Sequence, residues 1–206
     1  MVGDHDGDGG SVRGDGGGVS RPSVDRAGCV PLRIMDLNTL KHQPADLLLR
    51  LFAETLEELR RRDLVRSSNN PVADYAEKIA AHALTLRLIG KSGFGHDGED
   101  ASGKRYQVKG RRVTVQNESR QLSFMRRLDA KPFDYLVGII FNAEFRVHRA
   151  CIVPFEVVQA RAAFSKHVNA HRLLLRDDVW AVAGVRDVTA EMTKAAEEVC
   201  MSACGR

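Results

Sequence analysis

Residues 96–112 read HDGEDASGKRYQVKGRR, and this stretch decides the fold that we expect for the chain. The polar pair Ser102-Gly103 suits a tight turn, because glycine tolerates the backbone angles that turns require. Strand-like segments flank that turn, one at about 96–100 and the other at 104–113. The stretch therefore predicts two paired β-strands joined by a turn.

The alternation of side chains along the second of these strands groups polar residues. Successive side chains of a strand point to opposite faces, so Gln107 and Lys109 share one face. Tyr106 and Val108 take the other face, which we expect to be buried. Asp97 lies on the preceding strand and is expected to approach Gln107. A carboxylate, an amide oxygen and an ammonium group then converge.

This combination suits the hydrolysis of a phosphodiester bond with a divalent metal ion. Mg²⁺ (or Mn²⁺) takes oxygen ligands and keeps several waters, and Asp97 and Gln107 supply two such oxygens. Lys109 has the charge to orient or deprotonate an attacking water and to stabilise negative charge on phosphate. The alternative is a surface hairpin with Lys109 in solvent and Asp97 in a turn.

Basic residues are concentrated around the same hairpin. The whole chain has 206 residues and a net charge of +4, but residues 104–127 alone hold eight lysines and arginines and one acid, Glu118. Such a stretch matches a DNA phosphate backbone, and it is also typical of a solvated basic face. The arginines that we expect to contact phosphates are Arg111, Arg112, Arg120, Arg126 and Arg127.

The predicted elements around the hairpin describe a mixed α/β domain. The run DYLVGIIF at 134–141 has the length and apolar character of a buried strand. Residues 44–63 place apolar side chains at three- and four-residue spacing, which predicts an amphipathic helix. The order predicts the fold class α/β, with a small central mixed sheet flanked by helices. The other expected elements are helices at about 71–88, 119–128, 154–164 and 189–199, and extended segments at 145–153 and 171–176.

Several segments together resemble the PD-(D/E)XK nuclease superfamily, the fold of many restriction endonucleases, and an uncharacterised bacterial family of that kind. They read NNPVADYAEKIAAHAL at 69–84, YQVKGRR at 106–112 and FDYLVGIIF at 133–141. The resemblance covers about residues 68–192. It implies an αβββαβ core and metal-dependent cleavage of DNA. It also implies that Glu77, on the helix before the sheet, joins Asp97 and Gln107 in holding the metal.

One departure from that family's pattern affects the expected activity. Gln107 stands where the family has its second acid, and an amide oxygen is a weaker metal ligand than a carboxylate. Three classes of function stay open. The first is a metal-dependent endonuclease acting on DNA, in restriction or defence. The second is a catalytically weakened DNA-binding or regulatory module of the same fold. The third is a protein-interaction domain that uses the helix at 44–63.

A second polar group lies in SKHVNAH at 165–171. In an extended chain His167, Asn169 and His171 share one face, because side chains alternate. That face suits hydrogen bonds to DNA phosphates or base edges. A polar edge or loop is an equally good interpretation. A structural zinc site is a poorer one, because no carboxylate or cysteine is close in sequence.

Composition also indicates how the chain is organised. We expect residues 1–34, which are rich in glycine and aspartate, to be disordered, and Met35 is a candidate start. Residues 35–66 then form the N-terminal amphipathic helix, and 67–206 form the core with a C-terminal helix. The four cysteines show no metal spacing, and no membrane span or secretory signal is apparent. The expected location is the cytoplasm, with DNA as the partner and a homodimer left open.

Overall fold

The structure is a computed structural model that describes residues 37–90 and 95–203. The predicted disordered segment 1–34 and the candidate start Met35 lie outside the described residues. Residues 91–94 lie outside them as well. Within the described part, no helix is long and apolar enough to cross a membrane.

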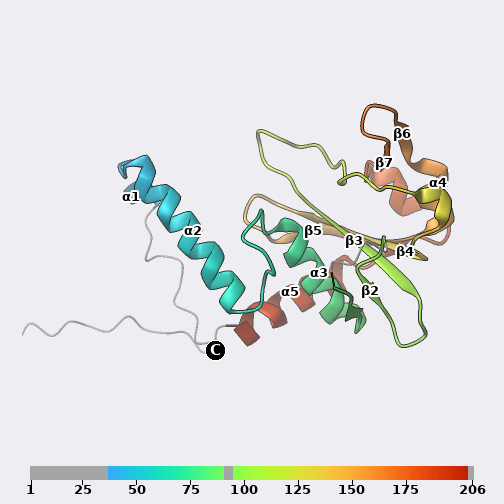
Figure 1. Ribbon diagram of the computed structural model, residues 1–206, viewed down its shortest axis with the longest axis horizontal. Coiled ribbons are helices and arrows are strands. Elements are labelled where there is room, and N and C mark those ends of the chain that lie inside the picture. The colour runs from blue at the N-terminus through green and yellow to red at the C-terminus, as the bar shows by residue number, and fades with distance from the viewer. Residues whose placement is uncertain (1–36, 91–94, 204–206) are drawn as a thin grey trace, which may run out of the picture.

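A mixed sheet forms the centre of the described part, in the order β1-β2-β3-β4-β5-β8 (Figure 1). Strands β3 and β4 run parallel, and every other pair of neighbours in this sheet is antiparallel. The prediction of an α/β fold with a small mixed sheet is therefore confirmed. The strands are β1 (Arg87–Leu88), β2 (Gly98–Glu99), β3 (Arg105–Arg112), β4 (Tyr135–Phe141), β5 (Val147–Pro154) and β8 (Arg186–Asp187).

Two helices cover one face of the sheet (Figure 1). They are α3 (Val72–Leu84) and α5 (Thr189–Ala203). The buried side chains of Ile79 and Met192 pack there against Val108 and Phe141. Gly110 allows α3 to lie directly on β3, because a Cβ at this position would lie 2.7 Å from the Val72 carbonyl oxygen. This face is thus a close-packed helix-on-sheet layer.

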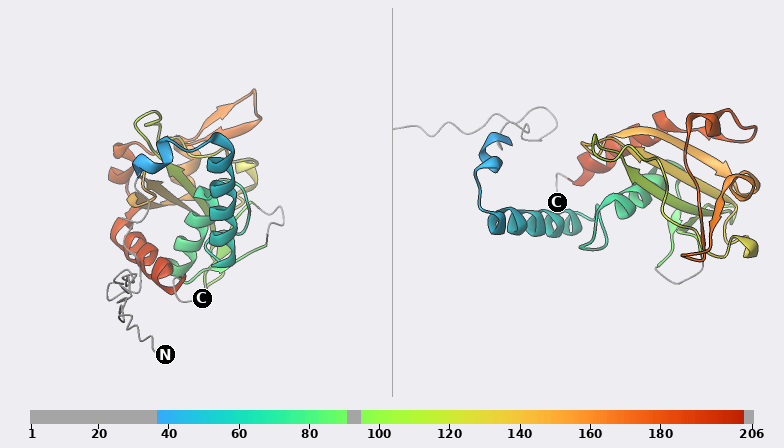
Figure 2. Two further views of the ribbon diagram at one scale, coloured as in Figure 1. Left: turned by 90° about the vertical axis from the view of Figure 1, so that its left-hand side faces the viewer. Right: turned by 90° about the horizontal axis from the view of Figure 1, so that it is seen from above.

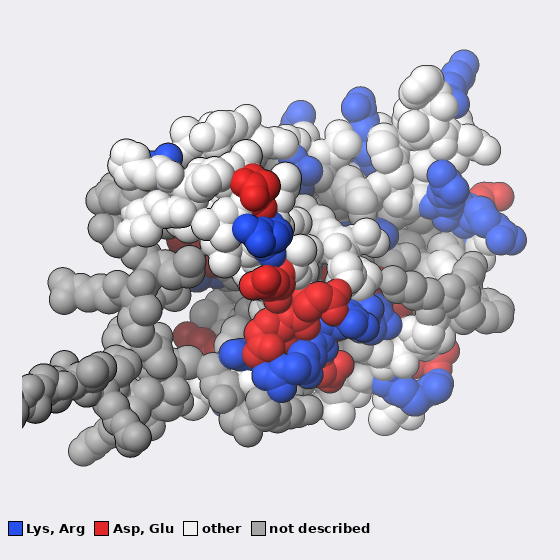
Figure 3. All heavy atoms as spheres, turned by 60° about the vertical axis from the view of Figure 1, so that its left-hand side comes forward, with Lys and Arg blue, Asp and Glu red and all other residues white. Residues whose placement is uncertain are grey.

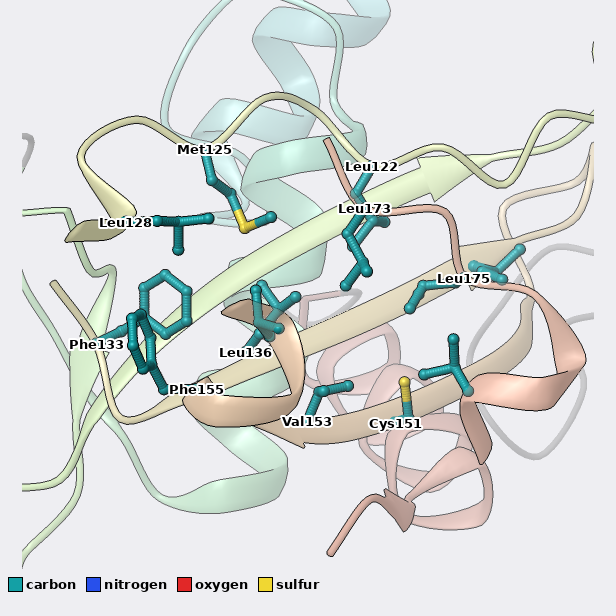
Figure 4. Packing of buried hydrophobic residues seen from close by; sticks show 13 residues of the cluster. Leu122, Met125, Leu128, Phe133, Leu136, Cys151, Val153, Phe155, Leu173 and Leu175 are labelled. Carbon is teal, nitrogen blue, oxygen red and sulfur yellow. The ribbon is translucent and has the colours of Figure 1, made fainter. Parts of the chain in front are cut away.

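The opposite face is covered mostly by irregular chain. Residues 113–134 and 173–181 cross it, together with α4 (Phe155–Arg161) and the small hairpin of β6 (Ala163–Ser165) and β7 (Ala170–Arg172). Short 3₁₀ turns lie at η2 (Leu128–Ala130) and η3 (Asp177–Ala181). Figure 4 shows side chains of these segments lying over those of β4 and β5. The cluster includes Leu122, Met125, Leu128, Phe133, Leu136, Cys151, Val153, Leu173 and Leu175.

The helix predicted at about 119–128 is wrong. This segment is extended and forms backbone hydrogen bonds with the chain after β6. The Leu122 amide donates to the Leu173 carbonyl at 3.0 Å, and Met125 and His171 exchange bonds of 2.8 and 2.7 Å. Leu122 and Met125 are buried at a three-residue spacing that also fits a helix. Hydrogen bonding to residues 171–173 holds this segment in an extended conformation. The local spacing of apolar residues does not reveal such pairing between distant segments.

The predicted amphipathic helix is present as α2 (Ala45–Arg61), preceded by the short α1 (Leu37–Lys41). Figure 2 shows both projecting from the sheet domain. Leu49 and Phe52 are 69% and 57% exposed, whereas Leu56 is buried. Towards its end α2 carries ion pairs between neighbouring turns, such as Arg60–Glu57 at 2.6 Å and Arg61–Glu58 at 2.7 Å. Figure 3 shows acidic and basic side chains gathered together on the side that includes α2.

Candidate functional site

The site begins where β2 starts, opposite the middle of β3. The Asp97 amide donates to the Tyr106 carbonyl at 2.8 Å, which places Asp97 directly across from Gln107. The Oδ2 atom of Asp97 accepts hydrogen bonds from the Gln107 amide nitrogen and, at 2.7 Å, from the Val108 backbone amide. Two donors thus fix the carboxylate. The approach to Gln107 was expected from the hairpin, and the Val108 contact is an addition to it.

Lys109 lies two residues further along β3, on the same face as Gln107. It is paired with Gly138 of β4, which has no side chain to crowd this face of the sheet. Burial lowers the pKa of Lys109 below its ordinary value, and the nearby Asp97 carboxylate partly opposes that shift. Within residues 37–90 and 95–203 the ammonium group of Lys109 has no hydrogen-bond partner. The structure therefore brings Asp97, Gln107 and Lys109 together.

Backbone groups contribute at the same edge. In a strand the N–H and C=O groups of one residue point to the same side. The Val108 N–H points to Asp97, so the Val108 carbonyl points to the same edge of β3. With Gln107 donating its amide nitrogen to Asp97, the Gln107 amide oxygen is left for another partner. The edge therefore presents oxygen atoms from a carboxylate, an amide and a peptide group.

A groove of about 770 Å³ opens next to this cluster. Gln107 lines it and is itself only 8% exposed. Arg126 and Arg127 are exposed on its rim, and neither has an ion-pair partner within the described residues. Arg105 is paired with Asp134 at 3.3 Å. The lining residues are Gly95, Arg105, Gln107, Phe124, Met125, Arg126, Arg127, Ala130, Pro132 and Phe133.

Glu77 does not join the cluster. Its carboxylate forms an ion pair with Arg66, in the loop before α3. That loop is held beside α3 because the buried Asp74 accepts hydrogen bonds from the backbone amides of Arg66 and Ser67, at 3.0 and 2.8 Å. Helix α3 lies on the opposite face of the sheet from Gln107. Within the described residues, no group of three or more histidine, cysteine or acidic side chains is arranged to hold a metal.

The arginines that were predicted to form one basic face do not all lie together, because some of them form hydrogen bonds within the protein. Arg111 donates to the Ser119 carbonyl and the Asn117 side chain, both at 2.8 Å. Arg112 points to the other face of β3, where it donates to the Ala143 carbonyl at 2.6 and 3.0 Å. These two arginines brace loops. Of the five arginines proposed from the sequence, Arg126 and Arg127 are those on the groove.

Arg120 also has a partner inside the fold. Its guanidinium is 2.7 Å from Asp177, which Arg149 contacts as well at 2.8 Å. Both arginines hold the pKa of the Asp177 carboxyl below its ordinary value. This contact joins the segment 113–134 to η3, so Arg120 serves the packing of the loop-covered face.

The predicted shared face of His167, Asn169 and His171 is not formed. Residues 166–169 are a turn, and Asn169 has a left-handed backbone angle of +47°. His171 lies on β7 with its ring 5.0 Å from that of Phe164, and its Nδ1 atom is buried without a hydrogen-bond partner in the described part of the chain. The alternation on which the prediction depended fails because the chain reverses here.

Sequence reasoning did not single out Arg105 and Phe124 as site residues. Phe124 lies inside the basic stretch, one residue before the buried Met125. An aromatic residue within a run of arginines is a signal for nucleic-acid contact that could have indicated it.

Compared with known proteins, the chain matches no family model and no curated protein.

Proposed function

We propose that this protein is a divalent-metal-dependent nuclease-like protein that hydrolyses phosphodiester bonds of DNA, on a restriction-endonuclease-like core. One observation carries the proposal. Lys109, with a lowered pKa, lies beside Asp97 and Gln107 next to a groove rimmed by arginines. Burying a lysine that has no hydrogen-bond partner is costly even beside a carboxylate, so such a position is characteristic of functional sites.

The order of elements supports the same core. Helix α3 precedes three antiparallel strands, and β4 then runs parallel to the third of them, β3. The resemblance implies an αβββαβ core, and this succession matches it except for the helix between the third and fourth strands. The crossover from β3 to β4, through residues 113–134, has no α-helix of its own. In the proposed core, the part of this crossover that lines the groove would take the place of that helix.

The donor set of the cluster fits a weakly held Mg²⁺ or Mn²⁺ ion. Magnesium is commonly held by one or two carboxylates, several waters and the phosphates of its substrate. Asp97 supplies the carboxylate, and Gln107 and the Val108 carbonyl supply neutral oxygens. When bound, the ion would polarise the phosphate and lower the pKa of a bound water. With one carboxylate, affinity depends strongly on the substrate.

The side chains would divide the remaining work. Lys109 would orient the attacking water or accept its proton, which a lysine with a lowered pKa does at lower pH than an ordinary one. Its charged form would stabilise negative charge on the phosphate. Arg126 and Arg127 would hold flanking phosphates through charge-assisted hydrogen bonds.

Cleavage of plasmid DNA in Mg²⁺, Mn²⁺ or EDTA tests the proposal. Asp97→Ala and Lys109→Ala should each lower the cleavage rate by roughly 10²- to 10⁴-fold, since each removes a group acting on the reacting atoms. Lys104→Ala is the matched control, because Lys104 is an exposed lysine of the same basic stretch outside the groove. Cleavage that persists in EDTA, or that Asp97→Ala leaves intact, would exclude the proposed chemistry.

A second candidate function is a DNA-binding module of the same fold without cleavage. The observation that favours it is the pairing of Glu77 with Arg66, which leaves Asp97 as the carboxylate of the cluster. Salt-dependent DNA binding without cleavage in any divalent metal would select this candidate. A chain without DNA affinity would instead favour α2, with its exposed Leu49 and Phe52, as a protein-interaction surface.

A further inference from the structure

The groove beside Gln107 has an apolar wall as well as a cationic rim. Phe124 lines it and is 39% exposed. The neighbouring Met125 is buried, and its backbone is hydrogen-bonded in both directions to His171. Phe124 is therefore held at the surface by a fixed backbone.

Another part of the groove's lining is also held in place. Pro132 and Phe133 line it, and Phe133 is 1% exposed. Gly95, with a left-handed angle of +80°, lies so close to Pro132 that a Cβ there would be 2.6 Å from the Pro132 Cβ. Arg127 and Lys131, on either side of η2, have positive backbone angles of +56° and +43°. Non-glycine residues rarely adopt such angles, and they are enriched at functional sites.

The groove's size and chemistry distinguish between forms of DNA. Its volume of about 770 Å³ lies within the range of small-ligand pockets. A nucleotide fits such a space, whereas a duplex does not enter it. The bases of a duplex are stacked, so their faces are covered by their neighbours. A base can lie against Phe124 only after it has left the stack.

We propose that this groove binds an unpaired nucleotide of single-stranded DNA, with its base against Phe124 and the adjoining phosphates on Arg126 and Arg127. This inference rests on the proposed function and specifies its substrate as an unpaired or single-stranded segment. Gln107 lines the same groove, so the strand that Phe124 holds passes the Asp97–Lys109 cluster. Phe124 then determines which form of DNA reaches that cluster.

Fluorescence anisotropy in EDTA tests the inference without any cleavage. The probes are a labelled single-stranded oligonucleotide, the same strand paired with its complement, and a strand of equal length made of abasic sites. Phe124→Ala should weaken binding of the single strand by roughly ten- to hundredfold, because base stacking on an aromatic ring contributes about that much. Binding of the abasic strand and of the duplex should stay within about twofold, because phosphate contacts are unchanged.

Two variants serve as controls. Phe124→Trp retains a stacking surface and should bind the single strand at least as tightly as the wild type. Phe164→Ala removes another exposed phenylalanine, 53% exposed on β6 and outside the groove, and should leave all three affinities unchanged.

The outcomes separate this inference from the function on which it rests. Equal effects of Phe124→Ala on all three probes, or no effect on any of them, would overturn the stacking inference. Metal-dependent plasmid cleavage would then still support the nuclease proposal. A protein that binds none of the three probes would overturn both.

Discussion

The two faces of the central sheet are built in different ways. Against one face lie α3 and α5, whose backbone hydrogen bonds are internal and whose apolar side chains pack closely on the strands. Against the other lie the segments 113–134 and 173–181, which satisfy backbone groups by pairing with each other. The helices pack closely on the middle strands of their face. The irregular layer leaves an opening beside β3, and that is where Gln107 and the groove are found.

If the proposed function holds, this difference places the reactive side chains on the loop-covered face. Helices on a sheet bury surface uniformly, so few polar groups are left beneath them. Loops leave gaps, in which a polar side chain such as Lys109 can be partly buried and still reach a substrate. Both faces bury large apolar clusters, so both should contribute to the free energy of unfolding. On the loop-covered face, the exposed lining of the groove should tolerate change without loss of stability.

The same substitution at a buried site under the helices and at the exposed lining of the groove should give the largest contrast. Phe141 is fully buried under the helices, and its ring is 5.4 Å from that of Tyr75, whereas Phe124 is partly exposed on the other face. Phe141→Ala should lower the free energy of unfolding by about 3–5 kcal/mol, because it removes buried apolar surface and leaves a cavity. Phe124→Ala should lower it by less than about 1 kcal/mol. Urea denaturation measures both, and equal decreases would show that Phe124 belongs to the packed core and is not free lining of the groove.

A pair of glycines provides a finer comparison. A Cβ at Gly110 would lie 2.7 Å from the Val72 carbonyl of α3, but at Gly138 it would lie 2.6 Å from Leu175 Cδ1. A helix backbone cannot yield as the end of a leucine side chain can. Gly110→Ala should therefore destabilise the protein by about 1–3 kcal/mol, and Gly138→Ala by less. Thermal unfolding of both variants checks the order, and a larger destabilisation by Gly138→Ala would reverse it.

Lys109 should reduce stability at neutral pH. Burial lowers its pKa below the ordinary 10.5. The positive charge is therefore less favourable in the folded state than in the unfolded chain, which lowers the free energy of unfolding. Lys109→Met should raise the free energy of unfolding by roughly 0.5–2 kcal/mol at pH 7. The difference between the wild type and the variant should shrink as pH rises from the lowered pKa towards 10.5. In that range Lys109 is neutral in the folded state, so the cost of burying its charge disappears. Unfolding at several pH values tests it, and a pH-independent difference would contradict this origin.

Replacing Arg126 and Arg127, the two arginines on the groove, should change stability least and DNA binding most clearly. Arg126→Ala with Arg127→Ala should change stability by less than about 0.5 kcal/mol, since neither has a partner within the described residues. The same pair should reduce the slope of log affinity against log salt by roughly 1.4–1.8, about 0.7–0.9 for each phosphate that is no longer neutralised. Arg111→Ala should act mainly on stability, because Arg111 braces the loop at Asn117. An unchanged salt slope would remove the groove as the binding face.

Local alternation explains what the sequence could predict of the site. Asp97, Gln107 and Lys109 come from one hairpin, so period-two geometry and a turn place them together. The strand β4 could be predicted because its apolar run needs burial on both faces. The helices α2 and α3 were recognisable from their apolar spacing.

The remainder of the site depends on contacts between segments far apart in sequence. The partner of Glu77 is Arg66 in a loop that Asp74 orders, and nothing in the helix pattern indicates that loop. The groove exists because residues 121–125 pair with residues 171–174. The internal partners of Arg111 and Arg120 likewise follow from loop conformation, so eight basic residues close in sequence did not become one basic surface.

The most direct test of the central claim is a Mg²⁺ titration of DNA cleavage by the wild type and by Gln107→Glu. If Gln107 holds the ion through its amide oxygen, the added carboxylate charge should lower the Mg²⁺ concentration for half-maximal cleavage and preserve or raise the rate. Gln107→Ala, measured alongside, should require more Mg²⁺ than the wild type. If neither the wild type nor Gln107→Glu cleaves DNA in Mg²⁺ or Mn²⁺, while both bind it, the cluster is not a hydrolytic site and the protein is a DNA-binding module.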